Sequence, residues 1–360
     1  MMRRISWIPL AALAWLSCAT DGSPVPSDGS PAPGDEEVVQ AHVREVRFVS
    51  AAPDGFEHVG NLYVPEWRVG ERLPAVAIAH GSGPNSRDGE LPGQLGMPFG
   101  FSIAVYRELA EALQAAGYVV LTYDKRTCGK WNGCANNDYE FGSWVAEVTV
   151  RTFSQDFEGA LRFLAKQPEV DPERLFAIGH SKGALYVPDV MRRLEGVRAG
   201  VMLAGTYSDI TDILAYQVEY LERQMREAGF GESTIDQQLG PIRLTVEALR
   251  ELQAGTWGSD PIQGLPVAYW QSLLDLGREA RENVPSLDRP ILVISGDKDT
   301  NVPPSETEAW MRALDGTIHP VKILPCVTHA LNCMRDSGVD RNVSDALVEA
   351  IIKFLNSAEK

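Results

Sequence analysis

Short apolar runs alternate with longer amphipathic stretches from about residue 44 to the end of this 360-residue chain. Such alternation is typical of a largely parallel β-sheet that is covered by helices on both faces. The apolar runs are rich in Val and Ile and are bounded by Gly, Pro or Asp, which indicates strands. We expect eight of them, at residues 44–50, 58–64, 74–79, 118–123, 174–179, 199–204, 290–295 and 319–324.

Helical periodicity fills most of the stretches between these strands. The first two strands follow each other too closely for a crossover helix, so we expect them to form an antiparallel edge. The sequence therefore predicts an α/β fold with one eight-stranded, mostly parallel sheet. The helices that cover it are expected at residues 102–116, 150–166, 182–195, 304–314 and 342–357.

Residues 206–286 interrupt this alternation. They contain helical patterns near 208–228, 236–253 and 266–283, with Gly and Pro breaks between them and no convincing strand. Ligand sites in α/β sheets lie at the carboxyl ends of the strands. An insertion this long after a strand therefore predicts a helical cap over those ends, and a helical domain that packs elsewhere is the alternative.

The motif GHSKG, residues 179–183, follows the predicted strand RLFAIG and precedes a predicted helix. A Gly-x-Ser-x-Gly motif in this setting holds its serine on a sharp, strained turn, and its glycines leave room for the turn. The serine hydroxyl is then presented for nucleophilic attack. The context favours Ser181 as a catalytic nucleophile, and an ordinary helix N-cap is the alternative.

A serine hydroxyl is a poor nucleophile at neutral pH until a base removes its proton. The chain has six histidines. His329 lies in the loop CVTHALNC after the last predicted strand, where the chain order serine, acid, histidine places the base. The other five lie in the N-terminal strands, in other motifs or at the start of a strand: His42, His58, His80, His180 and His319.

An acid is needed to hold the imidazole in the correct tautomer. The segment PILVISGDKDTNVPP supplies Asp297 and Asp299 directly after the preceding predicted strand. We expect Asp299 to orient His329, because it lies further past the strand end. Asp297 is the alternative, although an aspartate there is typical of a turn.

Acyl transfer also needs two backbone N–H donors aimed at the oxygen that becomes negative. One is expected at Lys182, immediately after the nucleophile. The other is expected at Ser82 in the segment HGSG, residues 80–83, and a plain turn is the alternative for this segment. We expect the side chain of Lys182 to point into solvent rather than toward an anionic acyl group.

Residues 1–19 have the pattern of an export signal: two arginines, an apolar run at residues 5–16 and the tripeptide SCA around Cys18. The apolar run is too short for a stable membrane span. Cys18 is similar to the lipidated cysteine of a bacterial lipobox, which predicts a membrane-anchored lipoprotein. Cleavage at a small-x-small site with plain secretion is the alternative.

Residues 20–43 are expected to be a disordered tether, because the segment TDGSPVPSDGSPAPGDEEV is rich in Pro, Gly, Ser and acid. The formal net charge of the chain is −16. Such a surface repels phosphate backbones and anionic lipid. We therefore expect no nucleic-acid partner, and membrane contact only through the N-terminal lipid.

Four cysteines, at positions 128, 134, 326 and 333, would remain after export. An even number of cysteines in an oxidising compartment predicts disulfides, of which the local pairs 128–134 and 326–333 are the simplest. A metal site is the alternative, but neither spacing is that of a CxxC motif. We expect no metal and no cofactor.

Five segments, in order within residues 58–356, resemble the signatures of bacterial α/β-hydrolases of the carboxylesterase type, which are related to dienelactone hydrolases and prolyl-oligopeptidase-type hydrolases. They are HGSGPNSRDGE, YDKRTCG, GHSKGALYVP, GDKDTNVP and THALN. The resemblance implies the α/β-hydrolase fold, an eight-stranded sheet, a triad of Ser181, Asp299 and His329, and no cofactor. The loop after YDKR departs from the family, which usually continues with Gly-x-Gly.

These features predict a serine hydrolase that cleaves small-molecule carboxylic esters through an acyl-enzyme intermediate. An exported peptidase or thioesterase with the same triad is the enzymatic alternative. An inactive, surface-anchored binding protein on a hydrolase scaffold is the alternative of another class. The cap aromatics expected to shape a pocket, or to be core, are Tyr207, Tyr216, Tyr220, Trp257, Tyr269 and Trp270.

Overall fold

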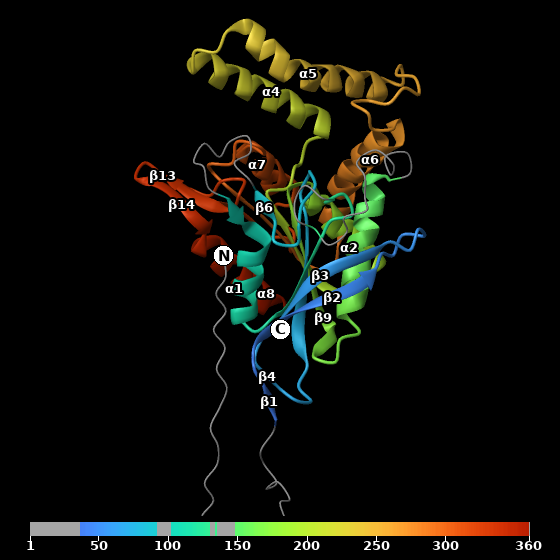
Figure 1. Ribbon diagram of the computed structural model, residues 1–360, viewed down its shortest axis with the longest axis vertical. Helices are drawn as coiled ribbons and strands as arrows, with labels where there is room; N and C mark the ends of the chain where they lie inside the picture. Colours follow the sequence, from blue (N-terminus) through green and yellow to red (C-terminus); the bar gives the residue numbers. More distant parts are fainter. Residues whose placement is uncertain (1–36, 92–101, 130–133, 135–147, 360) are drawn as a thin grey trace, which may run out of the picture. The chain divides into compact units, whose positions relative to one another are not determined.

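An eight-stranded sheet with the strand order β12-β11-β10-β9-β5-β8-β3-β2 is the centre of the fold (Figure 1). The computed structural model describes residues 37–91, 102–129, 134 and 148–359. All eight predicted strands are confirmed, each close to its expected bounds. They are β2 (His42–Val49), β3 (Glu57–Val64), β5 (Leu73–Ala79), β8 (Val119–Tyr123), β9 (Val170–His180), β10 (Val197–Leu203), β11 (Ile291–Gly296) and β12 (Val321–Leu324).

The direction of the strands gathers several loops at one edge of the sheet. Of the eight strands, β3 alone runs against its neighbours, since it pairs antiparallel with both β2 and β8. The remaining pairs are parallel, which confirms the antiparallel edge and the mostly parallel sheet. The carboxyl ends of β5, β9 and β11 therefore lie at the same edge, and the loops after them carry the candidate residues.

Helices cover both faces of the sheet (Figure 1). The inner strands, such as β5, β8, β10 and β11, are buried on both sides, which explains their continuous apolar runs, whereas the edge strands β2 and β12 are partly exposed. On one face Leu109 and Phe354 belong to the core cluster of α1 (Val105–Ala115) and α8 (Asp345–Ala358). On the other face the core cluster includes side chains from α2 (Val150–Leu164), α3 (Tyr186–Arg193), α6 (Val267–Asn283) and α7 (Pro304–Ala313).

The inserted segment between β10 and β11 is helical. Its first two helices, α4 (Ile210–Glu227) and α5 (Glu232–Ala254), pack against each other and lie side by side in Figure 1. The third helix, α6, contacts α2 and α3 on the face of the sheet. Helices thus occupy the three stretches in which the sequence predicts them.

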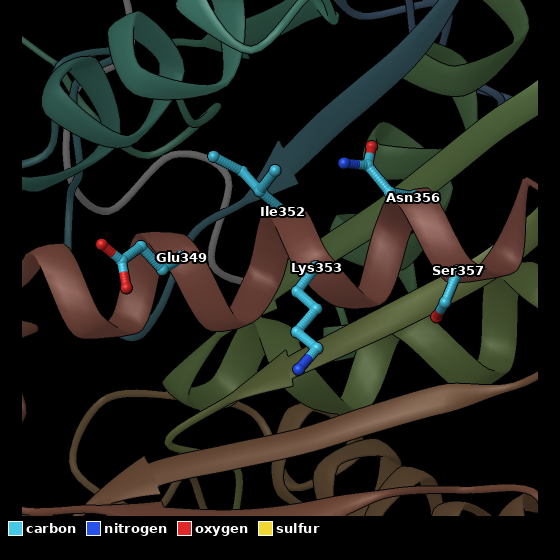
Figure 2. A pocket seen from close by; sticks show the side chains of 5 residues that line it. All are labelled: Glu349, Ile352, Lys353, Asn356 and Ser357. Atoms are coloured by element: carbon cyan, nitrogen blue, oxygen red, sulfur yellow. The ribbon is translucent and has the colours of Figure 1, made fainter.

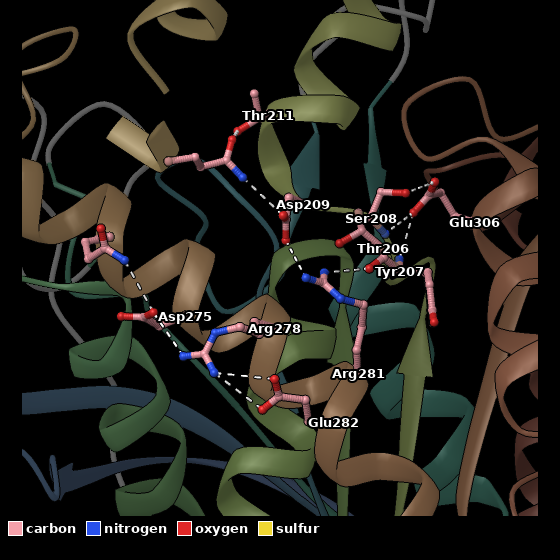
Figure 3. A network of polar contacts seen from close by, with 12 residues as sticks. Thr206, Tyr207, Ser208, Asp209, Thr211, Asp275, Arg278, Arg281, Glu282 and Glu306 are labelled. Carbon is pink, nitrogen blue, oxygen red and sulfur yellow. Dashed lines mark hydrogen bonds and ion pairs between the residues drawn. The ribbon is translucent and has the colours of Figure 1, made fainter. Parts of the chain in front are cut away.

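The start of the inserted segment is held by a polar network (Figure 3). Glu306 of α7 accepts hydrogen bonds from the amides of Tyr207 and Ser208, at 2.8 and 2.6 Å. Arg281 of α6 donates to the Tyr207 carbonyl at 2.8 Å and to an Asp209 carboxylate oxygen at 2.6 Å. Hydrogen bonds to charged groups are stronger than those between neutral groups. They fix the point at which the chain leaves β10 and enters α4.

Several elements differ from the sequence prediction. A hairpin of β13 (Asn332–Arg335) and β14 (Gly338–Val343) was not predicted, and α8 therefore begins at Asp345 rather than at residue 342. Residues 38–43, assigned to the disordered tether, include β1 (Val38–Val39), which pairs with β4 (Trp67–Arg68), and the start of β2. A short two-stranded pair, β6 (Glu90–Leu91) and β7 (Ile103–Ala104), precedes α1. The expected export signal, Cys18 and the rest of the tether lie outside the described residues.

Two disulfides join the predicted local pairs, Cys128 with Cys134 and Cys326 with Cys333. Bridges of this kind persist in oxidising compartments, so they indicate an exported environment. Among the helices that the structure describes, none is long and apolar enough to cross a membrane. The second bridge closes the loop that contains His329.

Replacing both Cys326 and Cys333 with serine is expected to lower the free energy of unfolding by about 2 kcal/mol, because the bridge restricts a short loop of the unfolded chain. Urea titration followed by circular dichroism, in the absence of reductant, measures the change against the wild-type protein. An unchanged unfolding midpoint would show that this bridge does not stabilise the fold.

Candidate active site

Ser181 stands on a strained turn between β9 and the short helix η2 (Ser181–Leu185). Its φ of 55° lies in the left-handed region, which non-glycine residues seldom adopt. A Cβ on Gly179 would approach the Gly183 carbonyl oxygen to 2.1 Å, and a Cβ on Gly183 would approach the His80 oxygen to 2.5 Å. Both motif glycines are therefore required by close backbone packing.

The structure brings Ser181, His329 and Asp299 together. The distance from Ser181 Oγ to His329 Nε2 is 3.1 Å, and that from His329 Nδ1 to Asp299 Oδ2 is 2.8 Å. A carboxylate can only accept, so Nδ1 carries the proton and the lone pair of Nε2 faces the serine hydroxyl. This is the arrangement in which a histidine can remove the serine proton.

Backbone hydrogen bonds hold Asp299 in place. Its Oδ1 accepts from the amides of Asn301 and Val302, at 2.9 and 2.8 Å, and its side chain is buried. Asp297, the alternative acid, is exposed and instead accepts a bond from the Cys326 amide at 2.7 Å. The carboxylate that contacts His329 is therefore that of Asp299.

The segment HGSG lies beside the nucleophile. A Cβ on Gly81 would be 3.0 Å from Ser181 Cβ, and Ser82 lines the same cavity as Ser181. The Gly81 amide donates to the Tyr106 hydroxyl at 3.0 Å, so it already has an acceptor and is not available for a substrate oxygen. Within the described part of the chain no acceptor is bonded to the Ser82 amide. Ser82 thus keeps a free N–H next to the cavity.

Two residues that the sequence did not indicate, Tyr106 and His180, connect the three loops of the site. His180 Nε2 donates to the His329 carbonyl at 2.9 Å. Since Nε2 carries the proton, Nδ1 accepts from the Tyr106 hydroxyl at 3.2 Å. A continuous chain therefore runs from the Gly81 amide through Tyr106 and His180 to the His329 loop. In the sequence His180 is only one of the five histidines set aside when His329 is chosen as the base.

Two buried histidines near the nucleophile are neutral. Burial, with the nearby His329, lowers the pKa of His180 to about 3. Burial, with the neighbouring Lys125, also lowers the pKa of His80 to about 3. Its Nε2 donates to the Tyr123 carbonyl. Both side chains therefore act as fixed hydrogen-bonding groups at neutral pH.

The side chain of Lys182 does not point into solvent as expected. Its Nζ donates to the Tyr269 hydroxyl of α6 at 2.7 Å and lies 5.3 Å from the centre of the Phe153 ring. The half-buried side chain therefore packs on aromatic rings at the base of the inserted helices. This correction arises because α6 covers the turn, a contact that the local sequence does not reveal.

A cavity of about 780 Å³ opens onto Ser181 and His329. Helix α4 supplies one wall of it, mostly apolar, through Ile210, Ile213, Leu214, Gln217, Tyr220, Leu221 and Gln224. Of the cap aromatics, Tyr220 lines this cavity, whereas Tyr269 and Trp270 belong to the core.

A second cavity of about 500 Å³ lies along α8 around Glu349 and Lys353, and its lining has no candidate catalytic group (Figure 2).

Within the described residues no group of three or more His, Cys, Asp or Glu side chains could hold a metal ion.

Known proteins resemble this chain in sequence. A family model described as serine aminopeptidase, S33 matches residues 99–333, more than half of the chain. The chain belongs to this hydrolase family. The esterase EstD of Thermotoga maritima is 26% identical over 300 residues, which cover 78% of this chain and 62% of that relative. The chain thus spans less than two thirds of the length of EstD.

Solved structures of other proteins share the fold. A hypothetical protein from Pseudomonas aeruginosa has a TM-score of 0.53 at 17% identity, with 89% of this chain and 94% of that chain covered. An esterase from Pyrococcus furiosus has a TM-score of 0.51 at 16% identity, with 88% and 90% covered. The α/β-hydrolase fold that the five motifs imply is therefore confirmed.

The protein is expected to lose stability as the pH falls from 8 to 5. An unfolded histidine takes up a proton near pH 6.5, whereas folded His80 and His180 do so only near pH 3. The folded state therefore binds fewer protons in this window, and each histidine removes about 2 kcal/mol of unfolding free energy.

Urea unfolding at the two pH values measures this loss, with His42→Gln, which removes an exposed imidazole, as the control. Equal unfolding free energies at pH 8 and pH 5 would contradict the assignment of two buried, neutral histidines.

Proposed function

We propose that the protein is a serine hydrolase that cleaves carboxylic esters through an acyl-enzyme intermediate. The observation that carries the proposal is the pair of contacts from His329 to Ser181 Oγ and to buried Asp299, at the edge of a large and partly apolar cavity. The similarity to EstD, an esterase by name, supports the same reaction.

Each step follows from the positions of these groups. Ser181 Oγ attacks the ester carbonyl carbon while His329 Nε2 takes its proton, and Asp299 stabilises the resulting imidazolium. The amides of Ser82 and Lys182 donate to the carbonyl oxygen as it becomes negative. The imidazolium then protonates the leaving alcohol. A water that gives its proton to His329 attacks the acyl group and releases the acid.

The charges around the cavity favour an ester over a peptide with a free amino terminus. A buried ammonium group is costly unless it is paired with an opposite charge and hydrogen-bonded. The acidic side chain in the described lining is Asp209, and it is ion-paired with Arg281. Asp299 is committed to His329. A neutral ester suits the wall of α4 better than a peptide ammonium does.

We also propose that this reaction takes place outside the cytoplasm, where the two disulfides persist. In this proposal the protein is held to a membrane by a lipid on Cys18, or is secreted. The acidic surface, with its net charge of −16, makes nucleic acid an unsuitable partner. A small-molecule ester is the proposed substrate.

Substitution of Ser181 with alanine is expected to abolish hydrolysis of p-nitrophenyl esters and labelling by a fluorophosphonate. Asp299→Asn should lower kcat about 10⁴-fold, because the imidazole then adopts the wrong tautomer. Asp297→Asn is the matched control, and it should retain nearly all activity because that carboxylate bonds only the Cys326 amide.

Initial rates with purified residues 20–360 measure these effects. Full activity in Ser181→Ala would contradict the serine mechanism. Equal losses in the two asparagine variants would contradict the assignment of Asp299.

The wall of α4 predicts the chain-length preference. Leu214→Trp should lower kcat/KM for long-chain p-nitrophenyl esters at least about 10-fold and leave acetate hydrolysis within twofold, because the indole fills part of the cavity. Leu244→Trp, at an exposed position of α5, is the control. Equal losses for short and long esters would show that the acyl chain lies elsewhere.

A further inference from the structure

Lys125 has a buried position behind the nucleophile and has no role in the steps above. It follows β8 in the motif YDKRTCG, and its side chain is only 4% exposed. Its Nζ donates to the carbonyls of Gly81 and Gly83, at 2.6 and 2.8 Å. Among the described residues no carboxylate lies within ion-pairing distance of it. The amine is thus directed at the segment HGSG and not at an acid.

These bonds determine the orientation of one peptide group. The described part of the backbone has no cis peptide bonds, and in a trans peptide the C=O and the following N–H point in opposite directions. The Gly81 carbonyl points to Lys125 Nζ, so the Ser82 N–H of the same peptide points away from it. Gly81 lies against Ser181, and Ser82 lines the cavity. The N–H therefore faces the space beside the nucleophile.

Asn85 acts on the same segment from within it. Its Nδ2 is 3.2 Å from the Gly81 oxygen, 2.9 Å from the Ser82 oxygen and 3.2 Å from the Gly83 oxygen. The backbone carbonyl of Asn85 accepts from the backbone amide of Lys125 at 3.1 Å. The segment HGSG is thereby fastened to the end of β8 at several points.

The neighbouring residue of the YDKR motif strengthens the same connection. Asp124 accepts from the Arg87 guanidinium at 3.0 and 3.2 Å and from the Arg87 amide at 2.9 Å. Bidentate pairs of this kind fix geometry as well as charge. Residues 81–87 after β5 and residues 124–125 after β8 are therefore joined by several hydrogen bonds, and Lys125 is the group that reaches the Gly81–Ser82 peptide.

We propose that Lys125 is a positioning residue for the oxyanion hole, because it holds the Gly81–Ser82 peptide so that the Ser82 N–H meets the substrate oxygen. The inference rests on the proposed esterase function. Lys125 does not contact the substrate. An amine retains two hydrogens even when it is neutral, so both carbonyl bonds persist in either protonation state.

Lys125→Met removes both hydrogen bonds, and with them the Nζ that lies 5.1 Å from the centre of the Phe153 ring, but keeps an unbranched side chain of similar length. We expect kcat for p-nitrophenyl esters to fall about 10²-fold, with KM within twofold. The reason is that the Ser82 N–H bonds the substrate oxygen strongly only in the transition state, when that oxygen is negative, so a misdirected N–H weakens the transition state and not substrate binding. An alkyl trifluoromethyl ketone adds to Ser181 Oγ and places an oxyanion at the same position. Its inhibition constant should rise by a similar factor.

Lys166→Met, on the exposed end of the chain segment after α2, is the control and should leave all three constants unchanged. Lys125→Gln serves if the methionine variant does not fold, since its side chain is too short to reach both carbonyls. A double-mutant cycle with Asn85→Ala tests whether the two side chains hold the same peptide. We expect the two losses to be clearly non-additive.

Unchanged kcat and unchanged ketone inhibition in a folded Lys125 variant would overturn this inference while the esterase function stands. Loss of kcat in proportion to the fraction of unfolded protein, with normal ketone inhibition, would also overturn it. Failure of the wild-type protein to hydrolyse any ester or to bind the ketone would instead refute the proposed function itself.

Discussion

The close packing of Gly179 against Gly183 is the constraint on which the site depends. It allows β9 to end in a turn so tight that Ser181 adopts a φ of 55°, at a cost of about 1–3 kcal/mol. The buried parallel strands on both sides of β9 offset that strain. The turn exposes the Ser181 hydroxyl, which lies within hydrogen-bond distance of His329, in a loop almost 150 residues later in the chain.

Neutral, buried polar groups hold the surrounding loops to this turn. The Gly81 amide, Tyr106, His180 and the His329 carbonyl form one hydrogen-bonded chain, in which every donor has an acceptor. Such satisfied networks specify a single arrangement, and each partner would be costly to leave unpaired. The same burial makes the fold sensitive to acid, because the imidazoles cannot be protonated without disruption. Stability and preorganisation of the site thus have one origin.

Most of the fold could be predicted from the sequence because its signals are local. Buried parallel strands appear as apolar runs, and the serine, acid and histidine each follow one of them. The hairpin of β13 and β14 was missed because its second strand, GVDRNV, is largely polar and exposed. The strand at Val38–Val39 was missed because it depends on pairing with Trp67–Arg68, almost 30 residues later.

The finer parts of the site could not be predicted because they depend on long-range contacts. The orientation of Lys182 is determined by Tyr269, 87 residues later. The contact of Tyr106 in α1 with His180 at the end of β9, and that of Lys125 with Gly81, likewise join parts of the chain that are far apart in sequence. Residue type alone does not indicate such partners, and only the assembled sheet brings them together. Motifs therefore identify the reacting groups, while tertiary packing determines how they are held.

Direct trapping of the covalent intermediate is the sharpest test of the serine mechanism. The protein is mixed with a p-nitrophenyl ester, quenched in acid within milliseconds and digested, and the peptides are analysed by mass spectrometry. The serine mechanism predicts that the acyl group is attached to Ser181 and that its amount matches the initial burst of p-nitrophenol. Acylation of another residue, or rapid hydrolysis with no acylated peptide, would contradict it.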